Sequence, residues 1–269
     1  MVVRKKKRFR MIPIDQYAYT NRLSNVHPLE KMVLALSFLL FAVITKDVLI
    51  SLITFFVMST FILFAAKIPL SLYCKLLLLP GFFLLTSIFS ILISFTTSTL
   101  PPHYWSMSFG SVQLFIGKAS VDTAFHLFFS VLASISCLYF IALTTPISAI
   151  TYAMRQLKIP IIFIELCELT YRFIFVFLQS MQAIYEAQQS RLGYQKKRRW
   201  FQSVGYLVTA MFKDVFRRSK QLHEAMASRC YNEDISSHYV TYQTERRNWL
   251  GIGVSLCLLG AVYLGGFYL

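Results

Sequence analysis

Apolar runs alternate with short polar corners along the chain, and five of these runs are long enough to cross a membrane. A membrane-spanning helix needs about 20 mostly apolar residues. Runs of this kind, separated by charged or proline-containing corners, cover residues 29–45, 48–66, 76–95, 119–143 and 249–269. A polar stretch at 96–117 separates the third run from the fourth. The pattern therefore predicts an all-α integral membrane protein with about five transmembrane helices.

A sixth apolar run, residues 159–180, carries two glutamates and an arginine, and the charge around it decides whether it crosses. If it crossed, the next segment, with its 12 lysines and arginines, would be external. Positive charge near span ends gathers on the cytoplasmic side instead. With five spans and a cytoplasmic N-terminus, only Lys46 and Lys118 of the 27 lysines and arginines lie outside. We therefore expect a multi-pass protein of the inner or plasma membrane, with its C-terminus outside.

A polar stripe runs along one long helix that we predict over residues 157–193. The remaining surface of this helix is apolar, and its polar side chains recur with a heptad period at Glu165, Glu168, Arg172, Gln179, Gln182, Glu186 and Gln189. The apolar side is too wide for a soluble amphipathic helix, so the helix is expected in the membrane interface or between other helices. Gly193 supplies a C-terminal stop. For the two glutamates nearest Arg172, we favour an internal ion pair over the paired carboxylates of an enzyme.

A second long helix, predicted over residues 203–229, follows a basic loop at 195–200. The basic run at 196–199 either contacts anionic lipid headgroups or is a solvated loop, and we favour lipid contact. Residues 145–158 are a candidate for a separate short helix. The chain then divides into a cytoplasmic N-terminal segment (1–28), a four-span membrane domain (29–143), a cytoplasmic platform of two long helices (144–248) and a final transmembrane helix (249–269).

Both platform helices end in a similar short string with an arginine at its centre. The strings are Ser190-Arg191-Leu192-Gly193 and Ser228-Arg229-Cys230, and a tyrosine follows each of them. Taken alone, either arginine is explained by the helix dipole, because a cation in the last turn complements the terminal carbonyls. Two matched basic ends additionally suit a partner with two equivalent grooves, such as a dimer of similar subunits.

Composition and motifs narrow the class of function. Of the 269 residues, 56% are hydrophobic and 14% are charged, with a net charge of +15. Such low charge density argues against a soluble nucleic-acid-binding protein. The five cysteines lack metal-ligand spacing, and a phosphate-binding glycine loop is absent, so ATP would have to be hydrolysed by a partner. Asp122 and His126 lie one turn apart and are a candidate ion relay, against the simpler interpretation as an interfacial pair.

Four groups of residues resemble the transmembrane (T) component of energy-coupling-factor (ECF) transporters, in particular the CbiQ type of cobalt and nickel importers. The resemblance covers nearly the whole chain. Both arginine strings are similar to the paired Ala-Arg-Gly signatures of that family but keep only the central arginine. The other three groups are Asp15, Ala18, Arg22, Leu23, Pro28 and Lys31; Thr144, Thr145, Pro146, Arg155 and Pro160; and Tyr171, Arg172, Phe173, Ile174, Glu186, Ala187 and Gln188.

The resemblance implies a non-catalytic coupling subunit of an ABC-type importer, with cobalt or nickel ion as cargo. It implies two ATPase subunits of the CbiO or EcfA type at the helix tips, and a substrate-binding membrane subunit of the CbiM type on the apolar platform face. ATP and Mg would bind to the ATPase subunits, and this chain would bind no cofactor or metal. The residues implied in ATPase coupling are Ser190, Arg191, Leu192, Gly193, Ser228, Arg229 and Cys230.

A structural role in the platform and its approach is expected for Asp15, Arg22, Pro146, Pro160, Glu165, Glu168, Arg172 and Glu186. Three alternatives stay open at this point. The first is an integral membrane enzyme that uses Glu165 and Glu168, or Asp122 with His126. The others are the T component of a vitamin importer and a membrane platform for an unrelated soluble partner.

Overall fold

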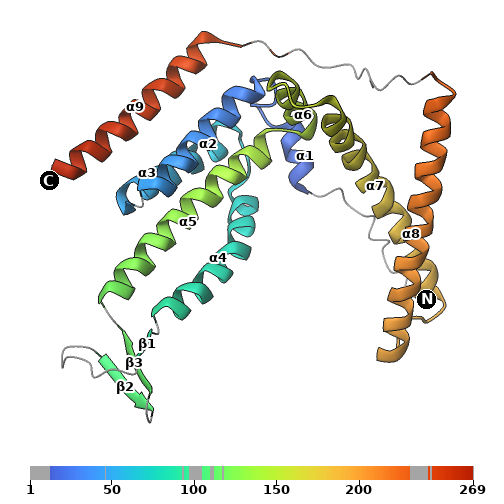
Figure 1. Cartoon of the computed structure of the whole chain (residues 1–269), viewed down its shortest axis with the longest axis horizontal. Helices are drawn as coiled ribbons and strands as arrows, with labels where there is room; N and C mark the ends of the chain where they lie inside the picture. Colours follow the sequence, from blue (N-terminus) through green and yellow to red (C-terminus); the bar gives the residue numbers. More distant parts are fainter. Residues whose placement is uncertain are drawn as a thin grey trace. The chain divides into compact units, whose positions relative to one another are not determined.

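The computed structural model describes residues 13–45, 47–92, 94–96, 105–109, 112–116, 118–230, 242 and 244–268. The described chain forms two compact units (Figure 1). Residues 14–146 with 242–268 form the unit that we call the bundle, and residues 147–230 form the unit that we call the helical module. The placement of residues 144–248 in the cytoplasm, outside the membrane, stays a prediction.

The bundle contains the apolar helices that the hydrophobic pattern predicts. Its elements are α1 (Pro13–Thr20), α2 (Pro28–Thr45), α3 (Val48–Thr60), the π-helix η1 (Phe61–Ala65), α4 (Leu70–Leu92), α5 (Lys118–Thr144) and α9 (Arg246–Tyr268). Five segments are long and apolar enough to span a membrane, namely Pro28–Thr45, Val48–Ala65, Leu70–Leu92, Ser120–Thr144 and Arg246–Gly265. The prediction of five spans is confirmed, and the protein is a multi-pass membrane protein.

The third span begins six residues earlier than its apolar run, at Leu70 instead of residue 76. Lys75 interrupts the apolar pattern there, and its side chain is exposed on the first turns of α4. A lysine near the end of a span can extend its amine to the interface while its methylene groups stay in apolar surroundings. The polar residue therefore marks the end of the membrane core without ending the helix.

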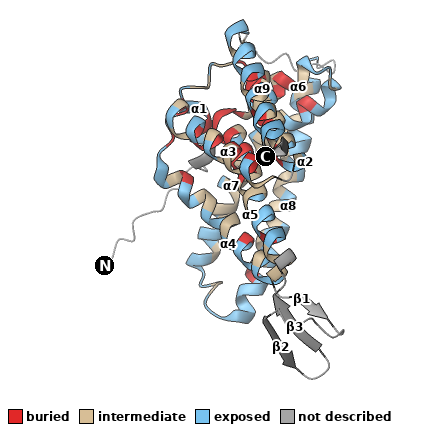
Figure 2. Cartoon of the chain, turned by 90° about the vertical axis from the view of Figure 1, so that its left-hand side faces the viewer, coloured by how far each residue is buried: buried red, intermediate tan, exposed pale blue. Residues whose placement is uncertain are grey.

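The core of the bundle lies where α2, α3 and α5 pack together. Phe38, Met58 and Leu143, one from each helix, are at most 1% exposed. Ala35 and Ala133 are fully buried, and such small side chains let apolar helices approach closely. In α4 only 6% of the apolar window is buried, and Figure 2 shows this helix largely exposed. Most of α4 thus presents apolar side chains outward, as a helix in contact with hydrocarbon does.

Two tyrosines attach α4 to the rest of the bundle. The hydroxyl of Tyr73 lies 2.8 Å from Ser59 Oγ and 3.1 Å from Ser136 Oγ. Pro80 lies inside α4 and has no N–H, so it leaves the carbonyl of Leu76 without its helical donor. The hydroxyl of Tyr139 on α5 donates to this carbonyl at 2.9 Å. A neighbouring helix therefore supplies the hydrogen bond that the proline removes, as burial in apolar surroundings requires.

The segment between α4 and α5 contains a small sheet, where the sequence indicated the end of the third apolar run and a polar stretch. Its strands are β1 (Ser94–Thr96), β2 (Trp105–Phe109) and β3 (Val112–Ile116), all antiparallel in the order β1-β3-β2. Trp105 pairs with Ile116, and Ser94 pairs with Phe115. Alternating polar and apolar residues in β2 are typical of a strand. The other regular elements among the described residues are helices, as predicted.

The helical module contains α6 (Ile147–Gln156), α7 (Ile161–Ser190) and α8 (Lys197–Ala227). The candidate short helix is therefore α6, and α7 begins after Pro160 and not at residue 157. A residue before proline is disfavoured in helical conformation, which separates the two helices. The sequence predicted a basic loop at 195–200 and a helix that begins at residue 203. The structure instead begins α8 at Lys197, with Trp200 N donating to Lys196 O at 2.8 Å.

Candidate functional site

The end of α7 is a Schellman motif that places Arg191 at the C-cap. Gly193 N donates to Gln188 O and Leu192 N donates to Gln189 O, both at 3.0 Å. The left-handed residue of the motif is Leu192, with φ of 58°. The predicted stop at Gly193 was therefore wrong by one position, because Leu192 is the left-handed residue that ends the helix. Arg191 is exposed beside this turn.

Gly193 has a different physical role, because α8 passes very close to it. A Cβ atom at this position would lie 2.6 Å from Ser203 Oγ and 3.1 Å from Gln188 O. Ser203 is buried and donates its hydroxyl to the Gly193 carbonyl at 2.9 Å. The ring of Tyr194 stacks at a tilt on Tyr185, with 4.8 Å between centroids. These contacts hold the α7–α8 turn against the start of α8.

The end of α8 shares two features with the end of α7, although its C-cap is Ser228 and not the arginine. Cys230 N donates to Ala227 O at 3.1 Å, and Cys230 has a φ of 55°. Arg229 is exposed and immediately precedes this left-handed residue, just as Arg191 precedes Leu192. The left-handed region costs roughly 1–2 kcal/mol for a residue with a side chain. We call residues 190–193 the α7 tip and residues 228–230 the α8 tip.

The two tips lie at opposite ends of α8. This helix has 31 residues. At a rise of 1.5 Å per residue it is about 46 Å long. Arg191 precedes the helix by one short turn and Arg229 follows it directly, so one compact binding site cannot contact both arginines. A partner of both tips must offer two separate sites.

A polar cluster links α7 to α8 between the tips, and the sequence analysis missed it. Asp214 Oδ2 accepts from Ser180 Oγ on α7 and from Arg218 Nε, both at 2.9 Å, and its other oxygen accepts from Arg217. These hydrogen bonds, that of Arg218 first, lower the pKa of Asp214 from 3.8 to about 2. The cluster borders a groove of about 510 Å³. One signal was available: Asp214 is the only acid among five lysines and arginines from 199 to 220.

The polar stripe of α7 is not gathered into one site. Glu165 is buried, Glu168 is half-buried and Arg172 is exposed. In the part of the chain that the structure describes, no ion pair joins Arg172 to either glutamate, so the expected internal pair does not form. Gln182 Nε2 does donate to Glu186 Oε1, at 2.8 Å. Opposite charges one turn apart on a half-exposed helix gain little over solvation, which is consistent with an exposed Arg172.

The N-terminal segment and the Thr-Thr-Pro segment, which are far apart in the sequence, meet at the end of α5. Asn21 Nδ2 donates to Leu143 O at 3.1 Å, and Lys31 Nζ donates to Thr144 O at 3.0 Å and to Leu23 O at 2.9 Å. The last carbonyls of a helix have no partner within it. Pro146, buried and without an N–H, closes this end of α5. These residues therefore cap a helix end by tertiary contacts.

Glu30, also missed in the sequence, fastens α9 to α2. It is only 2% exposed. Its carboxylate accepts from Asn248 Nδ2 at 2.8 Å and from the backbone N of Glu245 at 3.2 Å. A carboxylate at the beginning of a helix is favourable because it meets free N–H groups and the positive end of the dipole. Glu30 and Lys31 line a cavity of about 390 Å³ beside η1 and α9.

Of the remaining predicted structural residues, Glu186 borders the α7 tip, because its carbonyl accepts from Ser190 Oγ at 2.9 Å. Asp15 on α1 is half-buried, and burial raises the pKa of its carboxyl. Arg22 is exposed in the turn that follows α1, and Glu186 is exposed on α7. Pro160 precedes α7 and is exposed. Among the described residues, no group of three or more His, Cys, Asp or Glu side chains could hold a metal ion.

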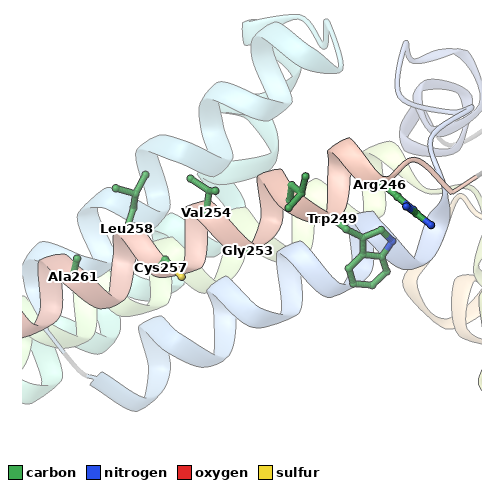
Figure 3. Close-up of a pocket in the computed structure, with 8 residues that line it drawn as sticks. Arg246, Trp249, Gly253, Val254, Cys257, Leu258 and Ala261 are labelled. Atoms are coloured by element: carbon green, nitrogen blue, oxygen red, sulfur yellow. The ribbon is translucent and has the colours of Figure 1, made fainter.

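The outward face of α9 forms an apolar groove of about 880 Å³ (Figure 3). Its small residues, Gly253, Cys257 and Ala261, recur every four positions along the groove, with Arg246 and Trp249 at one end. A Cβ atom on Gly253 would meet nothing within 4 Å. This geometry is typical of a membrane helix face that contacts lipid or another helix.

Comparison with known proteins identifies one family. The family model CbiQ, described as cobalt transport protein, matches residues 20–240. An uncharacterized protein of Methanocaldococcus jannaschii is 30% identical over 223 residues, which cover 82% of this chain and 81% of that protein. The cobalt transport protein CbiQ of Rhodobacter capsulatus is 26% identical over 256 residues, covering 95% and 98%. A putative fused cobalt transport protein CbiMQ of Methanocorpusculum labreanum is 30% identical over 220 residues, covering 81% of this chain and 36% of that protein.

Proposed function

Because the chain belongs to the CbiQ family of cobalt transport proteins, we propose that it is the coupling subunit of an ECF-type ABC importer. The cargo is cobalt ion, with nickel ion as the alternative. One observation carries the proposal: Arg191 ends α7 just before α8 begins, Arg229 follows the other end of α8, and each immediately precedes a left-handed residue. Such a pair suits two similar ATPase subunits, one at each tip.

In this proposal the chain transmits movement and does not hydrolyse ATP. ATP and Mg bind to the two ATPase subunits, whose closure displaces the α7 tip and the α8 tip. Arg191 and Arg229 anchor the tips by charge-assisted hydrogen bonds to carboxylates or carbonyls, each worth about 1.5–3 kcal/mol. Because α8 is one continuous helix, displacement of its ends moves the helical module as a unit.

The substrate-binding partner in the proposal is a membrane subunit of the CbiM type. The relative named as a fused CbiMQ protein supports this choice, since the two names are joined in one chain. Apolar side chains of α7, such as Ile162, Phe163 and Leu166, are exposed and would contact that subunit. An apolar contact has little directionality, so it permits the partner to rotate as the module moves.

The proposed orientation puts the helical module and the N-terminus in the cytoplasm and the C-terminus outside. The distribution of lysine and arginine supports it through the positive-inside rule. Lys197, Arg198 and Arg199 are exposed at the beginning of α8, where they would contact anionic headgroups at about 1 kcal/mol per cation.

Reversing both tip charges tests the proposal. Arg191→Glu with Arg229→Glu is expected to reduce co-purification of the ATPase subunits at least about ten-fold and to abolish cobalt uptake. The matched control is Lys158→Glu, which reverses an exposed cation in a left-handed position just before α7, far along the chain from both tips. If the double variant retains both the complex and the uptake, the tips are not the coupling sites.

A further inference from the structure

We propose that Asp214, through Ser180, is a positioning residue that fixes how α7 and α8 cross and thereby ties α8, which has a tip at each end, to the first half of α7. The inference rests on the proposed coupling function. Its physical basis is the polar cluster of Ser180, Asp214, Arg217 and Arg218, which lies between the tips and not at either one.

The cluster joins two helices through one carboxylate. Ser180 is the member on α7, and its hydroxyl donates to Asp214 at 2.9 Å and accepts from Arg218 at 3.2 Å. Arg217 and Arg218 approach Asp214 from its own helix, at positions i+3 and i+4. Asp214 is thereby held in one orientation by α8, and its remaining hydrogen bond reaches across to α7. The arginines hold the carboxylate in place, and the serine hydroxyl joins it to α7 by a hydrogen bond.

The position of the cluster makes it a brace for the hairpin. The α7–α8 turn is held by Gly193 and Ser203, which alone would leave a hinge. Ser180 lies about three helical turns before the end of α7, and Asp214 lies nearly five turns after the beginning of α8. A second contact at this distance from the turn prevents the helices from opening about it. Without that contact, a push on the α8 tip would change the angle between the helices instead of moving the module.

Four variants separate the brace from a general effect on folding. Ser180→Ala removes the contact to α7 and keeps both arginine pairs of Asp214, whereas Ser180→Thr keeps the hydroxyl. Asp214→Asn weakens the whole cluster. Glu224→Gln is the matched control, because Glu224 is the other acid of α8 and its partner Lys220 lies on the same helix.

The first measurement is the distance between the first half of α7 and the α8 tip, in the full chain in lipid nanodiscs. Spin labels are placed on Cys230, which is exposed at the α8 tip, and on Cys167, which is exposed in the first half of α7, after the other cysteines are replaced: Cys74, Cys137 and Cys257. We expect one narrow distance distribution for the unaltered cluster, for Ser180→Thr and for Glu224→Gln. Loss of the interhelix bond should shift the ratio of closed to open hairpin about ten-fold or more toward open, broadening the distribution in Ser180→Ala and Asp214→Asn.

The second measurement is cobalt uptake per ATP hydrolysed by the assembled complex. We expect Ser180→Ala and Asp214→Asn to keep the ATPase subunits bound while uptake per ATP falls, and Ser180→Thr to restore it. An unchanged distance distribution in Ser180→Ala overturns the brace. A broadened distribution in a chain that binds no ATPase subunit upholds the brace and overturns the coupling function instead.

Discussion

Two helix ends in the bundle are covered by buried side chains, whereas two helix ends in the helical module carry exposed arginines. In the bundle, the end of α5 is covered by Asn21 and Lys31, and the beginning of α9 is covered by Glu30, all three of them buried. In the module, Arg191 and Arg229 stand exposed at the ends of α7 and α8. A covered helix end cannot bind a partner, whereas an exposed end can. The difference separates the part of the chain that holds its shape from the part that offers contacts.

The largest effect is expected where a covered end of the bundle is opened. Lys31→Met keeps the volume near that of lysine but removes both donors, leaving Thr144 O and Leu23 O buried without them. Hydrogen bonds from a charged group are worth about 1.5–3 kcal/mol each, so we expect destabilisation of about 3 kcal/mol or more. Thermal unfolding in detergent measures it. Lys75→Met, at an exposed lysine of α4, should change the melting temperature little; equal losses would refute the cap.

A smaller effect should follow from closing the space at the α7–α8 turn. Gly193→Ala forces a methyl group against Ser203 Oγ and Gln188 O, which should cost about 1–3 kcal/mol. Gly205→Ala is the control on the same hairpin. It meets nothing within 4 Å, lies within α8 and should stabilise the helix by about 1 kcal/mol. Limited proteolysis of the module measures both changes in stability. If both variants became more stable, or both less stable, α8 would not pass as close to Gly193 as the structure shows.

Tyr139 supplies the hydrogen bond that Pro80 removes, so the effects of Tyr139→Phe and Pro80→Ala on the free energy of unfolding should not be additive. Tyr139→Phe should destabilise the bundle by about 1–2 kcal/mol, because it leaves Leu76 O without a donor. In a Pro80→Ala background, the new backbone N–H can donate to the same carbonyl, so Tyr139→Phe should then cost much less. A double-mutant cycle in thermal unfolding measures the coupling. Additive losses would mean that the hydroxyl does not replace the missing helical bond.

The smallest expected effect is that of pH, within the physiological range, on the stability that Asp214 contributes to the module. The folded pKa of Asp214, about 2, lies below its ordinary value of 3.8. Stabilisation by the ionised carboxylate is therefore complete above pH 3.8 and is lost as the pH falls through about 2. The difference in module stability between wild type and Asp214→Asn should stay constant from pH 5 to pH 8 and shrink below pH 4. A difference that varies near neutral pH would show that another group controls the contact.

The sequence patterns predicted most of the helices but few of the contacts between them. The five spans follow from apolar runs that match the membrane thickness, and α7 and α8 follow from their periodicity. The boundaries moved where a polar residue did not end a helix, as at Lys75 and Lys197. Glu30 and Ser180 were missed because their partners lie on other segments of the chain, and no local spacing indicates which helices meet. The arginines beside Asp214 are local, but its hydrogen bond to Ser180 on α7 is not. The sheet at β1–β3 was missed because its strands are short, and because β1 overlaps the end of the apolar run assigned to the third span.

The sequence by itself determined the chemical class of this protein: a membrane protein with five spans and two arginines at the ends of long helices. These features depend on local composition and periodicity, which the chain carries wherever it folds. Only the tertiary structure decided that Leu192 and Cys230 are left-handed, that Gly193 is required for close approach, and that Asp214 connects α7 to α8. Each of these depends on the backbone path or on a distant partner, which residue order alone does not specify.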